Sequence, residues 1–154
     1  MNEFTRVLVP VDGSPASERA LLRAIAIAAD HRAEIHFVHV IQRAQEQASF
    51  DDAQHAMHVV GDSLLDHAVA LACEQDLLGT SAVLVTNERR RSIAQQILCA
   101  ADAVAADLIV CGAHGTGSRT SLPHGSVADE LVACCRVSLM LEHELPLTQA
   151  EAVA

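Results

Sequence analysis

Lysine, tryptophan and tyrosine do not occur in this chain of 154 residues, and phenylalanine occurs only three times. The absence of lysine excludes a P-loop, whose lysine holds phosphates, and a Schiff-base mechanism. Because 51% of the residues are nevertheless hydrophobic, the core must be built from aliphatic side chains. Strands rich in valine, isoleucine and leucine are typical of a parallel sheet that helices cover on both faces.

Positive charge is also scarce, and the net charge is −10. An acidic protein lacks the basic face that binding to nucleic acid or to an anionic membrane requires. The sequence has no apolar run of about 18 residues, which a membrane span needs, and its beginning does not have the pattern of a signal peptide. We therefore expect a soluble, cytoplasmic protein that binds neither nucleic acid nor membrane.

The five cysteines form no Cys-x-x-Cys pair. Most of them lie in apolar stretches, so we expect reduced thiols in the core. The adjacent pair Cys134-Cys135 leaves a strained vicinal disulfide open as an alternative.

Short apolar runs alternate with longer helical patterns along the chain. The predicted strands are Arg6–Val11, Glu34–Ile41, Ser81–Thr86, Asp107–Cys111 and Val137–Glu142. The predicted helices are Ala16–Asp30, Asp51–Asp76, Ser92–Ala106 and Ser126–Cys134, and Gln42–Phe50 is predicted to be a loop. Residues 1–144 thus form one α/β domain, and residues 145–154 are expected to be a flexible tail.

Ligands of such sheets bind at the carboxyl ends of the strands, where the strand order reverses. Two glycine-bearing turns follow predicted strands, one at Asp12-Gly13 and one that begins at Gly112. We expect these two turns to form the walls of the binding crevice.

The second turn has the features of a phosphate site. It contains Gly112 and Gly115, and Gly125-Ser126 opens the following helix. Glycine lets backbone N–H groups approach an anion, and the N–H groups and dipole of a helix N-terminus attract negative charge. Alternatively, Gly125-Ser126 is only a helix start, since serine is a favoured N-cap. The segment Gly115-Thr-Gly117-Ser-Arg-Thr120 is not expected to bind a dinucleotide. It lacks the third glycine of the Gly-x-Gly-x-x-Gly fingerprint and follows the wrong strand.

The spacing Gly112-x2-Gly115-x9-Gly125-Ser126 occurs together with Val-Pro-Val-Asp-Gly-Ser at residues 9–14 and Val38-His39-Val40. This combination resembles the ATP-binding branch of the universal stress protein family, over the chain up to Leu141. The resemblance implies a Rossmann-like, three-layer α/β sandwich of the adenine nucleotide alpha-hydrolase-like kind. Its five-stranded parallel sheet has the order 3-2-1-4-5. It also implies a homodimer that pairs through the last strand, which is an unpaired sheet edge.

The same resemblance implies a site for ATP, or for ADP or AMP, accompanied by Mg²⁺ or Mn²⁺. Asp12 meets the nucleoside, although an aspartate before glycine also caps a turn on its own. The implied walls of the adenine pocket are Pro10, Val11 and Val40. The implied phosphate contacts are Gly112 and Gly115 in a first turn and Gly125, Ser126 and Val127 in a second. No catalytic residue and no protein ligand of a metal is implied.

His114 and Arg119 lie between the two phosphate turns. Arg119 either clamps the terminal phosphate or is a solvated loop charge. His114 either contacts phosphate, acts as a base or fills the turn. The run Arg89-Arg90-Arg91 follows the third strand, two places from the reversal point, and is interpreted as a solvated basic loop, with direct phosphate contact as the alternative.

An acid–histidine stripe runs along the long predicted helix. It consists of Asp51, His55, His58, Asp62 and Asp66. The residues expected to face the core are Met57, Val60, Leu64 and Leu71. The stripe is therefore expected to face solvent and to bind no metal specifically, although histidine and carboxylate at this spacing can ligate Zn²⁺.

Three residues depart from the family pattern: His124, where leucine is common, Arg136, which replaces a proline, and Ser138, inside the last strand. The last two bear on the expected dimer more than on the nucleotide site.

The function predicted from these features is that of a regulatory, stress-responsive ATP-binding protein. It holds ATP between the first and fourth strands with little or no turnover and acts on an unidentified protein partner. The alternative is a slow ATPase or nucleotidyl transferase on the same scaffold, but phosphoryl transfer usually needs more cations than one arginine and a metal. An interaction protein with an empty crevice is a third possibility. Retained nucleotide distinguishes the third from the others, and a turnover assay distinguishes the first two.

Overall fold

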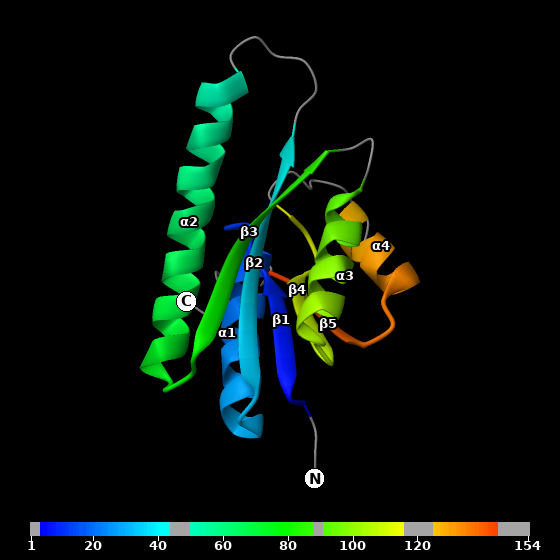
Figure 1. Cartoon of the computed structure of the whole chain (residues 1–154). Coiled ribbons are helices and arrows are strands. Elements are labelled where there is room, and N and C mark those ends of the chain that lie inside the picture. Colours follow the sequence, from blue (N-terminus) through cyan, green and yellow to red (C-terminus); the bar gives the residue numbers. More distant parts are fainter. Residues whose placement is uncertain (1–3, 44–49, 88–90, 116–124, 145–154) are drawn as a thin grey trace, which may run out of the picture.

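Five parallel strands form one sheet in the order β3-β2-β1-β4-β5 (Figure 1). The computed structural model describes residues 4–43, 50–87, 91–115 and 125–144. The strands are β1 (Arg6–Pro10), β2 (Glu34–Arg43), β3 (Gly79–Asn87), β4 (Leu108–Gly112) and β5 (Ser138–Glu142). The helices are α1 (Pro15–His31), α2 (Phe50–Glu74), α3 (Ile93–Val104) and α4 (Ser126–Cys134). The predicted fold class and strand order are confirmed.

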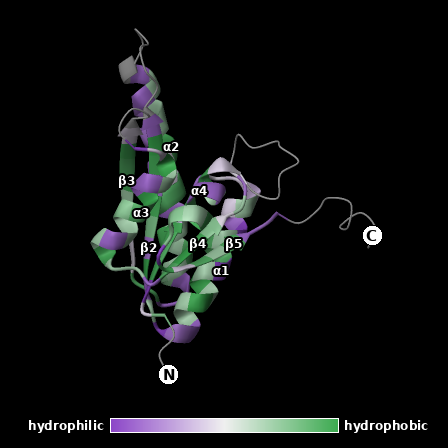
Figure 2. Ribbon diagram, turned by 90° about the vertical axis from the view of Figure 1, so that its right-hand side faces the viewer, coloured by the Kyte–Doolittle hydropathy of each residue, from purple (hydrophilic) through white to green (hydrophobic). Residues whose placement is uncertain are grey.

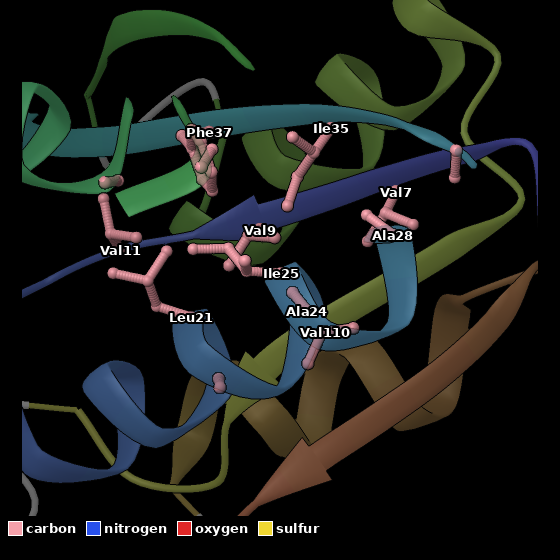
Figure 3. Packing of buried hydrophobic residues seen from close by; sticks show 14 of the residues in the cluster. Val7, Val9, Val11, Leu21, Ala24, Ile25, Ala28, Ile35, Phe37 and Val110 are labelled. Carbon is pink, nitrogen blue, oxygen red and sulfur yellow. The ribbon is translucent and has the colours of Figure 1, made fainter. Parts of the chain in front are cut away.

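Helices cover both faces of the sheet, which makes two hydrophobic cores. Alternate residues of a strand point to opposite faces. On the face of α1 and α2, Val7, Val9, Ile35 and Phe37 pack against Leu21, Ala24 and Ile25 (Figure 3). On the face of α3 and α4, Leu8, Val38 and Ile109 pack against Ile97 and Leu131. The hydrophobic residues accordingly lie along the strands, and hydrophilic residues are concentrated on the outer sides of the helices (Figure 2).

Local signals fix where two of the helices begin. The Ser14 side chain caps α1 by accepting a hydrogen bond from the Ser17 N–H (3.2 Å), and Pro15 follows in the first turn. Ser92 and Gln95 form a capping box at the start of α3. Each serine cap stabilises its helix by about 1 kcal/mol. None of the helices in the described ranges is long and apolar enough to cross a membrane.

The strand β2 is longer than predicted, because Gln42 and Arg43 continue it instead of starting a loop. They pair with Thr86 and Asn87 of β3. A polar residue stays in a strand when the neighbouring strand still offers its hydrogen-bonding groups, which a hydropathy pattern does not show. The ladder between β1 and β2 ends earlier, at Pro10↔Val38. The last part of β2 therefore has β3 on one side and lies beyond the end of β1 on the other.

The prediction for the inward face of α2 was partly wrong. The buried residues are Gly61, Leu65, Ala68 and Ala72. Met57 and Val60 are 42% and 56% exposed, whereas Leu64 and Leu71 are half-buried and pack against the core as predicted. Three of the four buried residues are small because the helix approaches the sheet closely, and a search for large apolar residues misses them.

The acid–histidine stripe of α2 does not lie wholly on the solvent face. His55, Asp62 and Asp66 are exposed as expected, but His58 is half-buried. His58 lies two turns before the buried Leu65, and so does not share the solvent face of the others. For Asp51, the structure describes the helical backbone and not the side chain. The expectation that the stripe binds no metal stays a prediction.

The cysteines are also placed differently from the prediction. All five are free, so the vicinal pair is not bridged, but only Cys111 is buried. Cys73, Cys99 and Cys134 are exposed, and Cys135 is half-buried. The exposed ones lie on the outward faces of helices, where an apolar run in the sequence does not mean burial.

Candidate functional site

A cleft of about 640 Å³ opens at the carboxyl ends of β1 and β4. The two strands are neighbours, and their connections leave toward opposite ends of the sheet, β1 toward β2 and β4 toward β5. This is the reversal point at which α/β sheets bind ligands. The lining residues are Pro10, Val11, Asp12, Ser17, His39, Val40, Gln42, Ile93, Ile97, Cys111, Gly112, Ala113, Gly115, Gly125, Ser126, Val127, Ala128 and Asp129. The volume is in the range of small-molecule sites.

The turn after β1 forms one wall and is held by a closed set of hydrogen bonds. The Ser14 N–H donates to Asp12 Oδ1 (2.8 Å), and the Asp12 N–H donates to Ser17 Oγ (3.0 Å). Gly13 has a φ of +82°, a left-handed conformation that favours glycine. Asp12 Oδ1 therefore caps the turn, and the residue also lines the cleft, so its contact with a nucleoside stays a prediction.

Gly112 and Gly115 of the second turn have different surroundings and therefore different roles. A Cβ on Gly112 would lie 2.8 Å from the Ser17 nitrogen and 2.9 Å from the Ala16 carbonyl carbon, so this glycine lets the first turn of α1 close against β4. A Cβ on Gly115 would lie 3.1 Å from Asp12 Oδ2. Gly115 thus lies directly beside the Asp12 carboxylate, whereas Gly112 is needed for packing. The Ser14 hydroxyl ties the two turns together by donating to the His114 carbonyl (3.3 Å).

The N-terminus of α4 forms the far wall. Its N-cap is Gly125, which makes no side-chain capping bond. The Gly125 N–H donates to the Ala113 carbonyl (2.7 Å), and Asp129 N–H bonds back to the Gly125 carbonyl (2.9 Å). The N–H groups of the first turn, at Ser126 and Val127, precede the first intrahelical bond and point to the N-terminal side. They give the cleft a positive end.

The opposite end of the cleft is aliphatic and is formed by β2 and α3. Ile93 and Ile97 of α3 line the cleft. Val40 and Gln42 belong to the part of β2 beyond β1. Because the Val11 N–H donates to the Val38 carbonyl (2.8 Å), the main-chain groups of Val40 point to the same side. They face the cleft past the last residue of β1.

His39 is a lining residue to which the sequence analysis gave no role beyond its place in the motif Val38-His39-Val40. Its Nδ1 lies 2.7 Å from the Val11 carbonyl oxygen, so the ring donates to the residue before Asp12. The ring also packs against Gly61 of α2, where a Cβ would lie 2.7 Å from its Cδ2 atom. Its position in the sequence, directly before the expected site residue Val40, was the feature that could have indicated that His39 lies at the site.

Cys111 is buried in the cleft wall at the end of β4. Burial, with a smaller contribution from the nearby Asp12 carboxylate, raises the pKa of this thiol to about 12. A thiol with this pKa stays protonated at neutral pH and is a poor nucleophile. Cys111 is therefore a wall residue and not a reactive one.

Nine of the eleven residues expected in the site lie together in the cleft. The ring of His114 stacks edge-on against His143 with a centroid separation of 6.2 Å, and His114 is not among the lining residues. Arg119 lies outside the described residues, as do Arg89 and Arg90 of the basic run. Arg91 is exposed, as expected for a solvated loop charge.

The fold and the motifs agree with known proteins. The model of the universal stress protein family matches residues 3–141. A structure of a universal stress protein family member from Burkholderia pseudomallei is 25% identical, with a TM-score of 0.74, covering 89% of this chain and 94% of its own. A universal stress protein of Archaeoglobus fulgidus in complex with dAMP is 22% identical (TM-score 0.65; 92% and 99% covered). A member from Arabidopsis thaliana with AMP bound is 17% identical (TM-score 0.68; 95% and 98% covered). Because the family model spans most of its length, this chain belongs to the universal stress protein family.

Proposed function

We propose that this chain binds an adenine nucleotide, in the first place ATP, in the cleft and acts as a regulatory binding protein with little or no turnover. The observation that carries the proposal is the first turn of α4, which opens without a side-chain cap on a cleft whose other end is aliphatic. One end of the cleft suits an anion and the other suits a flat apolar base, which is the polarity of a nucleotide.

The phosphates belong at the positive end. The N–H groups of Ser126 and Val127 and the dipole of α4 attract them, and the Ser126 hydroxyl is exposed beside them. Gly115 leaves space for the phosphates beside Asp12, because any side chain at this position would approach the Asp12 carboxylate. Arg119 stays a proposed clamp for the terminal phosphate, and His114 a proposed phosphate contact.

The base belongs at the aliphatic end. Pro10 and Val11, together with Ile93 of α3, line the cleft and offer the base apolar contacts. The outward main-chain groups of Val40 can hydrogen-bond one edge of a planar base, as a neighbouring strand would. The nucleotides carried by the Archaeoglobus and Arabidopsis proteins support adenine as this base.

Magnesium or manganese would accompany a triphosphate here as a phosphate-bound ion. In the described residues no group of three histidine, cysteine, aspartate or glutamate side chains is arranged to hold a metal. Asp12 and Asp129 nevertheless line the cleft. One or two carboxylates together with phosphates and water suffice for Mg²⁺.

Slow turnover follows from what surrounds the phosphates. The chain has no lysine, and the Cys111 thiol stays protonated at neutral pH. A phosphoryl transfer enzyme aims several positive groups at the transferring phosphate and a base at the nucleophile. None of the described residues that line the cleft is an arginine or a lysine, so the positive groups available to the phosphates there are backbone N–H groups.

Gently purified protein tests both halves of the proposal. Mass spectrometry under native conditions should find ATP or ADP retained, and hydrolysis of ATP with Mg²⁺ should stay far below about 1 s⁻¹, the lower end of ordinary enzymes. Turnover at or above that rate would replace the binding protein with an ATPase or nucleotidyl transferase. A protein that neither retains nor binds nucleotide would leave only the interaction protein.

A homodimer through β5 is part of the same proposal. The strand lies at the sheet edge, and Leu139, Met140 and Leu141 are each only half-buried. Glu142 at its end is fixed by Arg23 (2.8 Å) and Arg19 (3.7 Å) of α1. An unpaired edge with apolar side chains is stabilised by a partner strand, and a second copy supplies one.

A further inference from the structure

A second hollow, of about 370 Å³, lies beside the cleft. It is lined by His39, Val40, Ile41 and Gln42 of β2 and by Ala56, Met57 and Val60 of α2. Three of these residues, His39, Val40 and Gln42, also line the cleft. The two spaces therefore meet around the end of β2.

The hollow exists because three elements have different lengths. β1 stops at Pro10, whereas β2 continues to Arg43. The amino-terminal half of α2 extends along this free part of β2 (Figure 1). Gly61 is its point of close contact, against the His39 ring. Before Gly61 the helix presents the small Ala56 and leaves Met57 and Val60 largely exposed. An apolar surface of this kind at a pocket rim suits an apolar ligand group.

The polarity of the cleft determines which part of a nucleotide reaches the hollow. With phosphates at the N-terminus of α4, the base lies at β2. The edge of adenine that is farthest from its ribose carries the exocyclic amino group, N⁶. This edge therefore points toward Val40 and Gln42, where the cleft meets the hollow. A monosubstituted amino group keeps one N–H, so it can still donate to the main chain of β2.

We infer that the site accepts adenine nucleotides with an apolar substituent on N⁶, and that the substituent occupies the hollow between β2 and α2. This inference rests on the proposed nucleotide function and names the ligand class more closely. The space is sufficient, because a cavity of about 150 Å³ holds a benzene ring. The walls are aliphatic apart from His39 and Gln42, so the hollow favours an apolar group over a charged one.

Calorimetry on the full chain with Mg²⁺ tests the inference, with N⁶-benzyl-ATP compared with ATP. The wild-type protein is expected to bind the benzyl analogue about tenfold more tightly, from apolar surface that leaves water. Val60→Phe fills the hollow and should abolish this preference while leaving ATP affinity unchanged. Val59→Phe is the matched control, because Val59 is equally exposed (55% against 56% for Val60) but does not line the hollow. Unchanged ATP affinity also shows that each variant is folded.

Ala56→Phe fills the hollow from another turn of α2 and should repeat the effect of Val60→Phe. The inference is overturned if ATP binds and the benzyl analogue binds no more tightly than ATP, or if the Val59 and Val60 variants have the same preference between the two nucleotides. These results would leave the proposed nucleotide function intact. Failure of both nucleotides to bind the wild-type protein would instead remove the proposed function, and this inference with it.

Discussion

Replacing Gly112 by alanine should destabilise the fold, whereas replacing Gly115 by alanine should not. The two glycines belong to one motif and are three residues apart, yet their surroundings differ. The methyl group at position 112 would meet the main chain of α1, at 2.8 Å from the Ser17 nitrogen and 2.9 Å from the Ala16 carbonyl carbon. The methyl group at position 115 would meet one side-chain oxygen, Asp12 Oδ2, at 3.1 Å.

The magnitudes follow from what can move. Main-chain atoms in the capped first turn of α1 cannot yield without disturbing Ser14 and Ser17, which are both buried. Overpacking of this kind costs about 1–3 kcal/mol, and each kcal/mol lowers the Tm of a domain of this size by about 2–4 °C. The Asp12 side chain has to move by only a few tenths of an ångström to make room, so Gly115→Ala should change the free energy of unfolding by less than about 0.5 kcal/mol. Neither glycine has a left-handed φ, so backbone strain does not enter.

Urea unfolding followed by circular dichroism measures both variants, and an unchanged m-value shows that the midpoints are comparable. We expect a lower midpoint for Gly112→Ala and a midpoint like that of the wild type for Gly115→Ala. Equal stability of all three proteins would refute the assignment of Gly112 to helix packing. A Gly115 variant that is the less stable of the two would show that the roles have been exchanged.

Three other changes have defined outcomes. Burial alone would raise the pKa of Asp107, but hydrogen bonds from the Arg6 and Thr5 main chain and the Thr5 hydroxyl hold this pKa below its ordinary value of 3.8. The ionised carboxylate therefore stabilises the fold fully above pH 3.8, and this contribution is lost as the pH falls through the lowered pKa. Asp107→Asn should therefore lower the free energy of unfolding at pH 7 by about 1–3 kcal/mol, and an Asn variant whose deficit persists unchanged at pH 2 would contradict this. The Cys111 thiol, with a pKa of about 12, should resist a thiol reagent at pH 8 in the native protein while the exposed cysteines react, as peptide mapping can show. Leu139→Pro should convert a dimer to a monomer in light scattering, and a wild-type monomer at micromolar concentration, or a dimer that survives the change, would exclude β5 as the interface.

The α/β fold class followed from the sequence because alternating strands and helices leave few topologies, whereas the strand order came from the family resemblance. The capped starts at Ser14 and Ser92 carry their own local signals, and the apolar runs of β1 and β4 fit buried strands. Together with the family resemblance, these features located the cleft and nine of its residues.

The features that the sequence did not reveal depend on contacts between distant elements. The steric role of Gly112 exists only because α1 approaches β4, and the inward face of α2 is set by close contact at Gly61 and Ala68. The bond from His39 to the Val11 carbonyl needs β2 beside the turn after β1. Neither hydropathy nor spacing carries information about such approaches, so these residues emerge only from the three-dimensional arrangement.

The central claim is that the cleft between the β1 turn and α4 holds ATP. The most direct test is a calorimetric titration of ATP with Mg²⁺ into the wild-type chain and into Gly115→Val, whose larger side chain lies against Asp12 inside the cleft. The account predicts one ATP per wild-type chain and no measurable binding in a variant that is still folded. Equal affinity of the two proteins, or no binding by the wild type, would contradict it.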